Sequence, residues 1–144
     1  MPATAHQLPT WECIELLRDH GIGRMCLLDG AYPIAVPINY RVVNDAHGQP
    51  RLVVRTTPDA LVGKYRGPCA LEVDEIDLPH ERAWSIIARG TLVPVHGHHE
   101  LPDPAPIVGG NRSQWMTVDI VAITGRRFVL SDAGDGWSVD WQIT

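Results

Sequence analysis

The residues best suited to chemistry lie in the segment RLVVRTTPD, where Arg55, Thr56 and Thr57 follow a β-branched, strand-like run. If a helix begins at Thr57, its first N–H groups, two hydroxyl groups and one guanidinium converge on one place, which is how proteins hold a phosphate. Lys64, about two helical turns later, can add a further positive charge. A strand followed by a threonine cap is also a common structural device, so the segment is consistent with a phosphate site or with a simple helix cap.

Two prolines interrupt the strand-like segment PIAVPINY. Because Pro33 and Pro37 have no N–H group, they cannot donate to the ladder of a central strand, and they predict a sheet edge or a bulge. The backbone of such an edge, together with the side-chain amide of Asn39, can hydrogen-bond a planar heteroaromatic ring. An irregular edge strand without any ligand fits these residues equally well.

Three tryptophans mark the ends of predicted elements. Trp84 and Ser85 open one predicted strand after a charged turn, and Trp115 opens another. An indole near a strand end can cap a barrel or stack on a ligand or partner, while packing in the core or in an interface is the plainer alternative. Trp11 falls among the apolar positions of a predicted helix, and we expect it to be buried there.

Other combinations of reactive residues predict no site. The segment HGHHE offers imidazole and carboxylate ligands, but its glycine and the prolines after it predict a solvated loop formed by His96, His98, His99 and Glu100. The cysteines are widely spaced and flanked by apolar residues, which predicts buried thiols at Cys13, Cys26 and Cys69. No nucleophile, base and acid combination has a local signature, so we expect neither a metal site nor a catalytic side chain.

The elements that must position these residues are short and mostly extended. A helix is predicted over about 10–20 with Thr10 as its cap, strands joined by hairpins over about 22–130, a short helix over 57–66, and a tail over 131–144. This order predicts one mainly β domain over 1–144, an antiparallel barrel with two or three short helices. So small a barrel has no room inside for a cofactor, and a ligand must therefore bind in an outer groove or at a subunit interface.

The composition argues against several partner classes. Twelve basic and seventeen acidic residues give a net charge of -5 with no basic block, which argues against nucleic-acid binding. The sequence shows neither a secretory leader pattern nor an apolar run of about 18 residues that could span a bilayer. We therefore expect a cytoplasmic protein that binds neither nucleic acid nor membrane.

The order of these segments resembles a known family. The stretches GRMCLLDGAYPIAVPINYRVV, LVVRTTPD, EVDEID and WSIIARG are similar to those of the pyridoxamine 5′-phosphate oxidase-like flavin-binding split-barrel proteins, especially the short actinobacterial type, over residues 10–130. The resemblance implies a split β-barrel homodimer with two FMN sites at the subunit interface. It also implies a departure, because such relatives usually carry a basic residue where this chain has Leu61, with Lys64 one turn later.

The resemblance assigns roles to particular residues. It implies that the flavin ring lies along the backbone of Val36, Pro37, Ile38 and Asn39. Its phosphate would meet Arg55, Thr56 and Thr57, with Lys64 as a substitute for the missing basic residue. Trp84 and Ser85 would lie near the ring or the interface, with Trp115 contributed by the partner chain.

The function implied is that of a flavin (FMN)-dependent oxidoreductase acting on a small molecule that the sequence does not identify. The cofactor supplies the redox chemistry in such proteins, which agrees with the lack of a catalytic acid–base pair. Two alternatives stay open: a reductase that uses the deazaflavin F420, and a non-catalytic dimeric protein that binds a flavin or haem. A pyridoxamine phosphate oxidase in the strict sense is disfavoured, because the chain lacks a second cluster of basic residues for a second phosphate.

Overall fold

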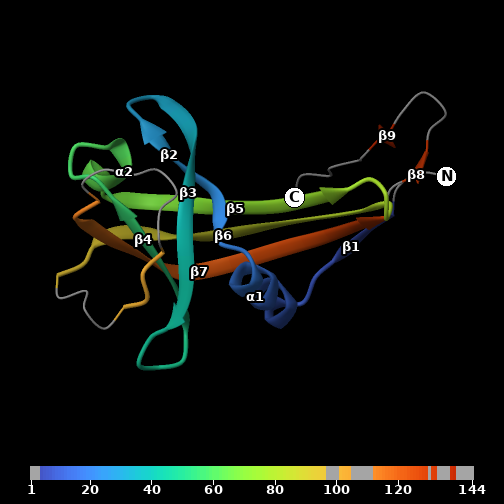
Figure 1. Ribbon diagram of the computed structural model, residues 1–144, viewed down its shortest axis with the longest axis horizontal. Coiled ribbons are helices and arrows are strands. Elements are labelled where there is room, and N and C mark those ends of the chain that lie inside the picture. The colour runs from blue at the N-terminus through green and yellow to red at the C-terminus, as the bar shows by residue number, and fades with distance from the viewer. Residues whose placement is uncertain (1–3, 97–100, 105–111, 130, 133–136, 139–144) are drawn as a thin grey trace.

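A computed structural model shows a mainly β protein in which one antiparallel sheet curls into a split barrel (Figure 1). The structure describes residues 4–96, 101–104, 112–129, 131–132 and 137–138. The expected fold class is confirmed. The elements are β1 (Thr4–Gln7), α1 (Thr10–Asp19), β2 (Ile22–Asp29), β3 (Tyr32–Asn44), β4 (Pro50–Thr56), α2 (Leu61–Lys64), β5 (Gly67–Asp77), β6 (Arg82–Pro94), β7 (Gln114–Val129), β8 (Ser131–Asp132) and β9 (Trp137–Ser138).

The sheet closes because its longest strand pairs on both sides. The strand order is β1-β7-β4-β3-β2-β5-β6, and β6 also pairs with β7. The first part of β7 lies between β4 and β6, and its last residues, 126–129, lie between β1 and β6. Strand β1 was not predicted, because its four residues, Thr4–Gln7, carry no apolar alternation. The register of β6 against β7 shifts at Gly90, where a Cβ atom would lie only 2.1 Å from the carbonyl oxygen of Asp119.

The interior of the barrel is filled with buried side chains, which leaves no room there for a ligand. The hydroxyl of buried Tyr40 donates to the carbonyl oxygen of Leu17 at 2.8 Å and so ties α1 to β3. The cysteines form no disulfide; Cys13 and Cys69 are buried as predicted, whereas Cys26 is half-buried. The largest fully buried side chains are Tyr40, Phe128, Leu17, Met25, Leu52, Leu71, Ile86, Leu92, Met116, Val53 and Val54.

Helix α1 differs from the prediction at its first turn. Pro9 occupies the N-cap position with no side-chain hydrogen bond, and Thr10 is already helical. Trp11 is 62% exposed, so the prediction that it lies on the buried face was wrong. The buried positions are Cys13 and Leu17, four residues apart on one face. Trp11 lies two residues before Cys13, which is about 200° around the helix, and it therefore points to the opposite side.

Helix α2 is shorter than predicted and begins later. The N–H of Ala60 donates to the carbonyl oxygen of Thr57 at 3.1 Å, and the helix spans only Leu61–Lys64 with Ala60 as its N-cap. Thr57 is therefore not a helix cap. A proline disfavours helical geometry at the residue before it and suits the second position of a β-turn, which explains why Thr57, Pro58, Asp59 and Ala60 form a turn instead.

Two predictions concern regions that the structure describes only in part. His96 is exposed, while His98, His99 and Glu100 lie outside the described residues, as does most of the tail over 131–144. None of the helices described is long and apolar enough to cross a bilayer. Within the described part of the chain, no group of three metal-ligating side chains is suitably placed for an ion.

Candidate functional site

The barrel splits where β3 and β4 part. Their pairing runs from Asn44 opposite Pro50 to Tyr40 opposite Val54 and ends there. Beyond this point β3 continues alongside β2, whereas β4 stays with β7 through the pairs Arg55–Trp115 and Thr56–Gln114. A cavity of about 150 Å³ lies between the parted strands and the start of α2.

The two prolines of β3 explain why one side of this strand is left open. The N–H of Tyr40 donates to the carbonyl oxygen of Gly21 at 2.9 Å, so the backbone of Tyr40 faces β2. Because N–H groups alternate sides along a strand, the nitrogens of Pro33 and Pro37 face away from β2. Residues 32–39 pair only with β2 among the described strands, which confirms the predicted edge. Pro37 cannot extend the ladder towards β4.

Six of the residues assigned by resemblance meet at this cavity. Val36, Pro37, Ile38 and Asn39 form one wall, and Arg55 and Thr56 form another. The remaining lining residues were not predicted as site residues: Ala60, Leu61, Val62 and Arg112. The cavity is therefore apolar along most of its surface, and its lining includes two arginines, Arg55 and Arg112.

Arg55 is held by three kinds of contact. Its Nε donates to the carbonyl oxygen of Arg112 at 3.1 Å, and its Nη1 donates to Oδ2 of Asp103 at 2.8 Å. The guanidinium carbon lies 4.9 Å from the ring centroid of buried Trp115. Among the described residues, no hydrogen bond is made by Nη2 of Arg55. The guanidinium is thus fixed in place and keeps donors for an anion.

The turn after β4 forms the floor beside Arg55. Thr56 is buried, and its hydroxyl is not an unsatisfied group, since no buried side-chain polar atom lacks a partner in the described part of the chain. Gly63 lets α2 approach this turn closely, because a Cβ atom at this position would lie 2.2 Å from the carbonyl oxygen of Thr57. Thr57 is half-buried and Lys64 is exposed, and neither lines the cavity.

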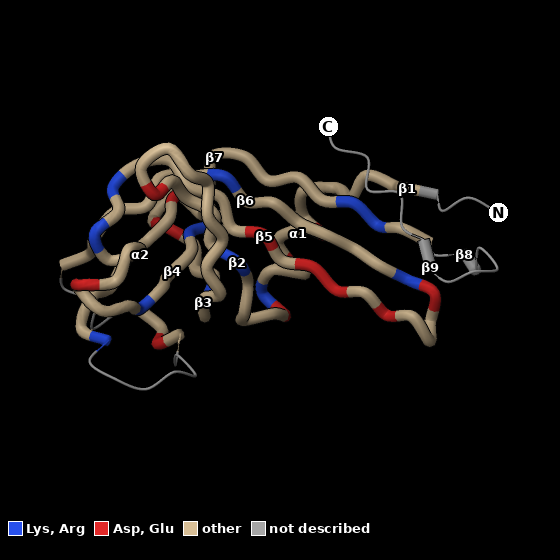
Figure 2. The backbone as a smooth tube through the Cα atoms, turned by 90° about the horizontal axis from the view of Figure 1, so that it is seen from above, with Lys and Arg blue, Asp and Glu red and all other residues tan. Residues whose placement is uncertain are grey.

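Trp84 and Ser85 lie at the other end of β6. Ten residues separate Trp84 from Pro94, which is about 33 Å of strand. Trp84 packs edge-on against His20 with ring centroids 4.7 Å apart, and it lines a second cavity of about 440 Å³. Acidic residues follow β5 towards this end (Figure 2), namely Glu72, Asp74, Glu75 and Asp77. The structure therefore does not bring Trp84 and Ser85 to Arg55 within one chain.

The positions of Trp115 and of two unpredicted residues change the expected site. Trp115 contacts Arg55 of its own chain, whereas the resemblance implied that it comes from a partner. Arg112 precedes β7, the strand that pairs with Arg55, and this proximity is the one signal that could have found it. Asp103 lies 48 residues from Arg55 in an irregular segment, and nothing in the sequence pattern indicates their contact.

Comparison with known proteins gives consistent results. A family model described as pyridoxamine 5′-phosphate oxidase matches residues 9–127. No curated protein matches the chain. An FAD binding protein from Mycobacterium smegmatis is 25% identical with a TM-score of 0.67, covering 87% of this chain and 99% of that one.

Two more distant structures share the fold. An FAD-binding protein from Mesorhizobium loti is 17% identical with a TM-score of 0.67, covering 90% of this chain and 99% of that one. An FAD and heme binding protein from Mycobacterium smegmatis is 15% identical with a TM-score of 0.57, covering 83% of this chain and 71% of that one. At these identities the likeness extends to the fold alone.

Proposed function

The chain belongs to the pyridoxamine 5′-phosphate oxidase family, and from this membership we propose that it is a flavin-dependent oxidoreductase whose cofactor phosphate binds at Arg55. The observation that carries the proposal is the geometry of Arg55, which is fixed by Trp115 and by the carbonyl oxygen of Arg112 at the open side of β3. The naming of the Mycobacterium smegmatis relative as an FAD binding protein supports a flavin as the ligand.

The charges at the cavity favour an anion. Arg55 and Arg112 face it, and Asp103 is the one carboxylate that ion-pairs with Arg55 in the described part of the chain. Both charged side chains among the described residues that line the cavity are therefore cationic. Leu61 supplies an apolar wall where the resemblance implied a basic residue, and we propose Arg112, which also lines the cavity, as the second cation.

The donor set fits a phosphate with an attached aromatic ring. Arg55 binds and orients the phosphate, since a guanidinium can donate two parallel hydrogen bonds to it. The backbone edge at Val36–Asn39 and the apolar side chains of Leu61 and Val62 hold the ring and exclude water from it. The flavin, when bound, supplies the hydride or electron transfer, and no side chain is required to act as nucleophile.

The size of the cavity supports a shared site in a homodimer. A volume of about 150 Å³ is below the range of roughly 300–1,000 Å³ that is usual for cofactor pockets. One chain can therefore hold the phosphate end, while a second copy covers the ring. The outward residues Pro33, Ala35 and Pro37 of β3 are exposed and apolar, as a surface covered by a second copy would be. In such a dimer, Trp84 and Ser85 reach a site only from the partner.

FMN, F420 and haem can be separated by titrating the cofactor-stripped protein with each. We expect micromolar or tighter binding of FMN, followed by flavin fluorescence, and bleaching of the bound flavin by a reduced nicotinamide. Sedimentation of the loaded protein should give a dimer. A Soret band without flavin binding would instead support the non-catalytic haem-binding alternative, which the apolar Leu61 in the cavity wall favours.

If F420 alone binds, the phosphate site stands but the cofactor assignment changes. If none of the three ligands binds, the proposed function is wrong.

A further inference from the structure

The carboxylate of Asp103 accepts a hydrogen bond from a guanidinium N–H group of Arg55 that the cofactor phosphate would also need. Its Oδ2 lies 2.8 Å from Nη1 of Arg55, on the group that the proposed function assigns to the phosphate. A carboxylate and a phosphate oxygen compete for the same donors of a guanidinium. The two anions also repel each other when they lie side by side.

The partners of Arg55 differ in how deeply they are buried. Trp115 is buried in β7, and the carbonyl oxygen of Arg112 belongs to the backbone just before that strand. The side chain of Asp103 is 53% exposed, while that of Arg55 is only 25% exposed. Of the two ion-paired groups, the carboxylate is therefore the one nearer to water, whereas Trp115 and the carbonyl oxygen of Arg112 hold Arg55.

We propose that Asp103 is a specificity-determining residue, an internal competitor that a ligand must displace from Arg55, so that the cavity selects phosphomonoester dianions over carboxylates. The inference rests on the proposed function. A tethered carboxylate has a high effective concentration at Arg55, and a small carboxylate ligand gains nothing by replacing it. A phosphomonoester carries more charge and three acceptor oxygens, so it gains on exchange.

The test is titration of Asp103→Asn with FMN and with riboflavin, which is the same ring system without the phosphate. Removing the competing charge should tighten FMN binding roughly threefold to tenfold, which is the scale of an exposed ion pair between Arg55 and a phosphate dianion. Riboflavin binding should stay unchanged, because riboflavin has no phosphate. Asp103→Glu keeps the charge and should bind FMN as the wild type does.

Asp119→Asn is a matched control. Asp119 of β7 pairs with Arg51 of β4 at 2.6 Å, so this substitution also removes a carboxylate charge from an ion pair with an arginine of β4. Asp119 lies opposite Arg51, which is four residues, or about 13 Å, along β4 from Arg55. The affinity of Asp119→Asn for FMN should equal that of the wild type.

Weaker FMN binding by Asp103→Asn, or an equal change for FMN and riboflavin, would overturn the inference, because Asp103 would then serve to orient Arg55. A second probe keeps the test independent of the flavin assignment. Inorganic pyrophosphate should also bind more tightly to Asp103→Asn than to the wild type. Intrinsic tryptophan fluorescence follows this binding, and Trp115→Phe shows whether the signal comes from Trp115. Equal pyrophosphate binding by the variant and the wild type would overturn the inference even if no flavin binds.

Discussion

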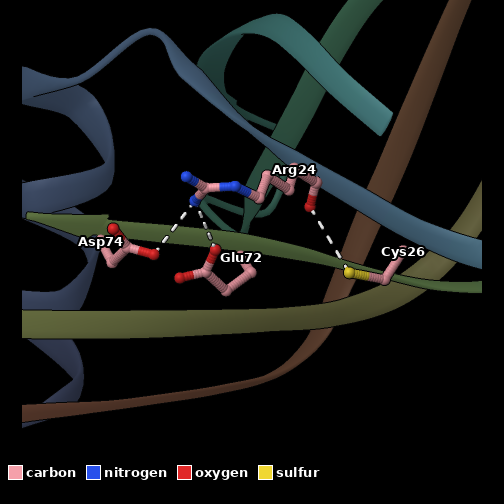
Figure 3. A network of polar contacts seen from close by, with 4 residues as sticks. All are labelled: Arg24, Cys26, Glu72 and Asp74. Carbon is pink, nitrogen blue, oxygen red and sulfur yellow. Dashed lines mark hydrogen bonds and ion pairs between the residues drawn. The ribbon is translucent and has the colours of Figure 1, made fainter. Parts of the chain in front are cut away.

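Arg24 and Arg55 both pair with carboxylates, yet only Arg55 is suited to bind a ligand. Nη1 of Arg24 donates to Oε2 of Glu72 at 2.9 Å and to Oδ2 of Asp74 at 3.0 Å (Figure 3). Its side chain is 54% exposed. Among the residues that the structure describes, Arg55 has one carboxylate partner, an aromatic ring and a backbone carbonyl.

The charge balance explains this difference. Glu72 and Asp74 are alternate residues of β5 and so point to the same face, where both approach Arg24. Burial, with the hydrogen bond and the charge of Asp74, raises the pKa of Glu72 to about 7. That cluster already has more negative than positive groups and repels a further anion. Around Arg55, the described part of the chain places one carboxylate, that of Asp103, and both charged residues that line the cavity there are arginines, so this arginine is better suited to accept a phosphate.

The largest expected effect is the loss of flavin affinity on removing Arg55. Arg55→Ala should weaken FMN binding by about 1.5–3 kcal/mol, the scale of a hydrogen bond to a charged group. Arg24→Ala removes the same charge from the other cluster and should leave the affinity unchanged. Fluorescence titration measures both variants. Equal losses would mean that net charge, and not the geometry of Arg55, governs binding.

The second effect is the pH dependence of stability at the Arg24 cluster. Because the pKa of Glu72 is raised to about 7 from an ordinary value of 4.5, the native state binds more protons than the unfolded state between these pH values. The free energy of unfolding should therefore fall as the pH rises from about 4.5 to about 7. Solvent screens this side chain, which is 25% exposed, so we expect a loss of about 1–2 kcal/mol.

Urea unfolding at a series of pH values measures this dependence. Glu72→Gln cannot titrate, and its profile should be flatter than that of the wild type by this amount. Glu75→Gln, a nearby change of the same kind on β5, should keep the wild-type slope. A slope that survives in Glu72→Gln would show that another group causes it. FMN affinity should be the same in both variants.

The smallest effect concerns the ring beneath Arg55. Trp115→Phe weakens the cation–π contact, which is worth roughly 0.5–1 kcal/mol, and should reduce FMN affinity about twofold to fivefold. Trp11→Phe changes an exposed tryptophan far from the contact and is the control. Unchanged affinity in Trp115→Phe would mean that the carbonyl oxygen of Arg112 alone fixes the guanidinium.

Local sequence chemistry predicted the parts of the site that depend on one strand. Pro33 and Pro37 indicated the open edge of β3 because their missing N–H groups have direct consequences for pairing. Arg55 was found because it ends an apolar strand. The predicted start of α2 at Thr57 was wrong, because the preference of Thr57-Pro58 for a turn outweighed the capping preference of threonine.

Contacts between distant segments could not be predicted in the same way. Asp103 and Arg112 reach Arg55 across the sheet, and their places depend on the register of β4 against β7. The same register places Trp115 opposite Arg55. The sequence alone shows only that Trp84 and Trp115 both lie near strand ends, so it does not tell which of them meets Arg55. Tertiary pairing decides which of two strand-end tryptophans lies at the site.

The most direct test of the central claim is a crystal structure of the protein loaded with FMN. We expect the phosphate within hydrogen-bond distance of the Arg55 guanidinium, the ring along Val36–Asn39, and the carboxylate of Asp103 turned away. A flavin phosphate bound instead beside Trp84 and Arg127, with the Arg55–Asp103 ion pair intact, would contradict the account.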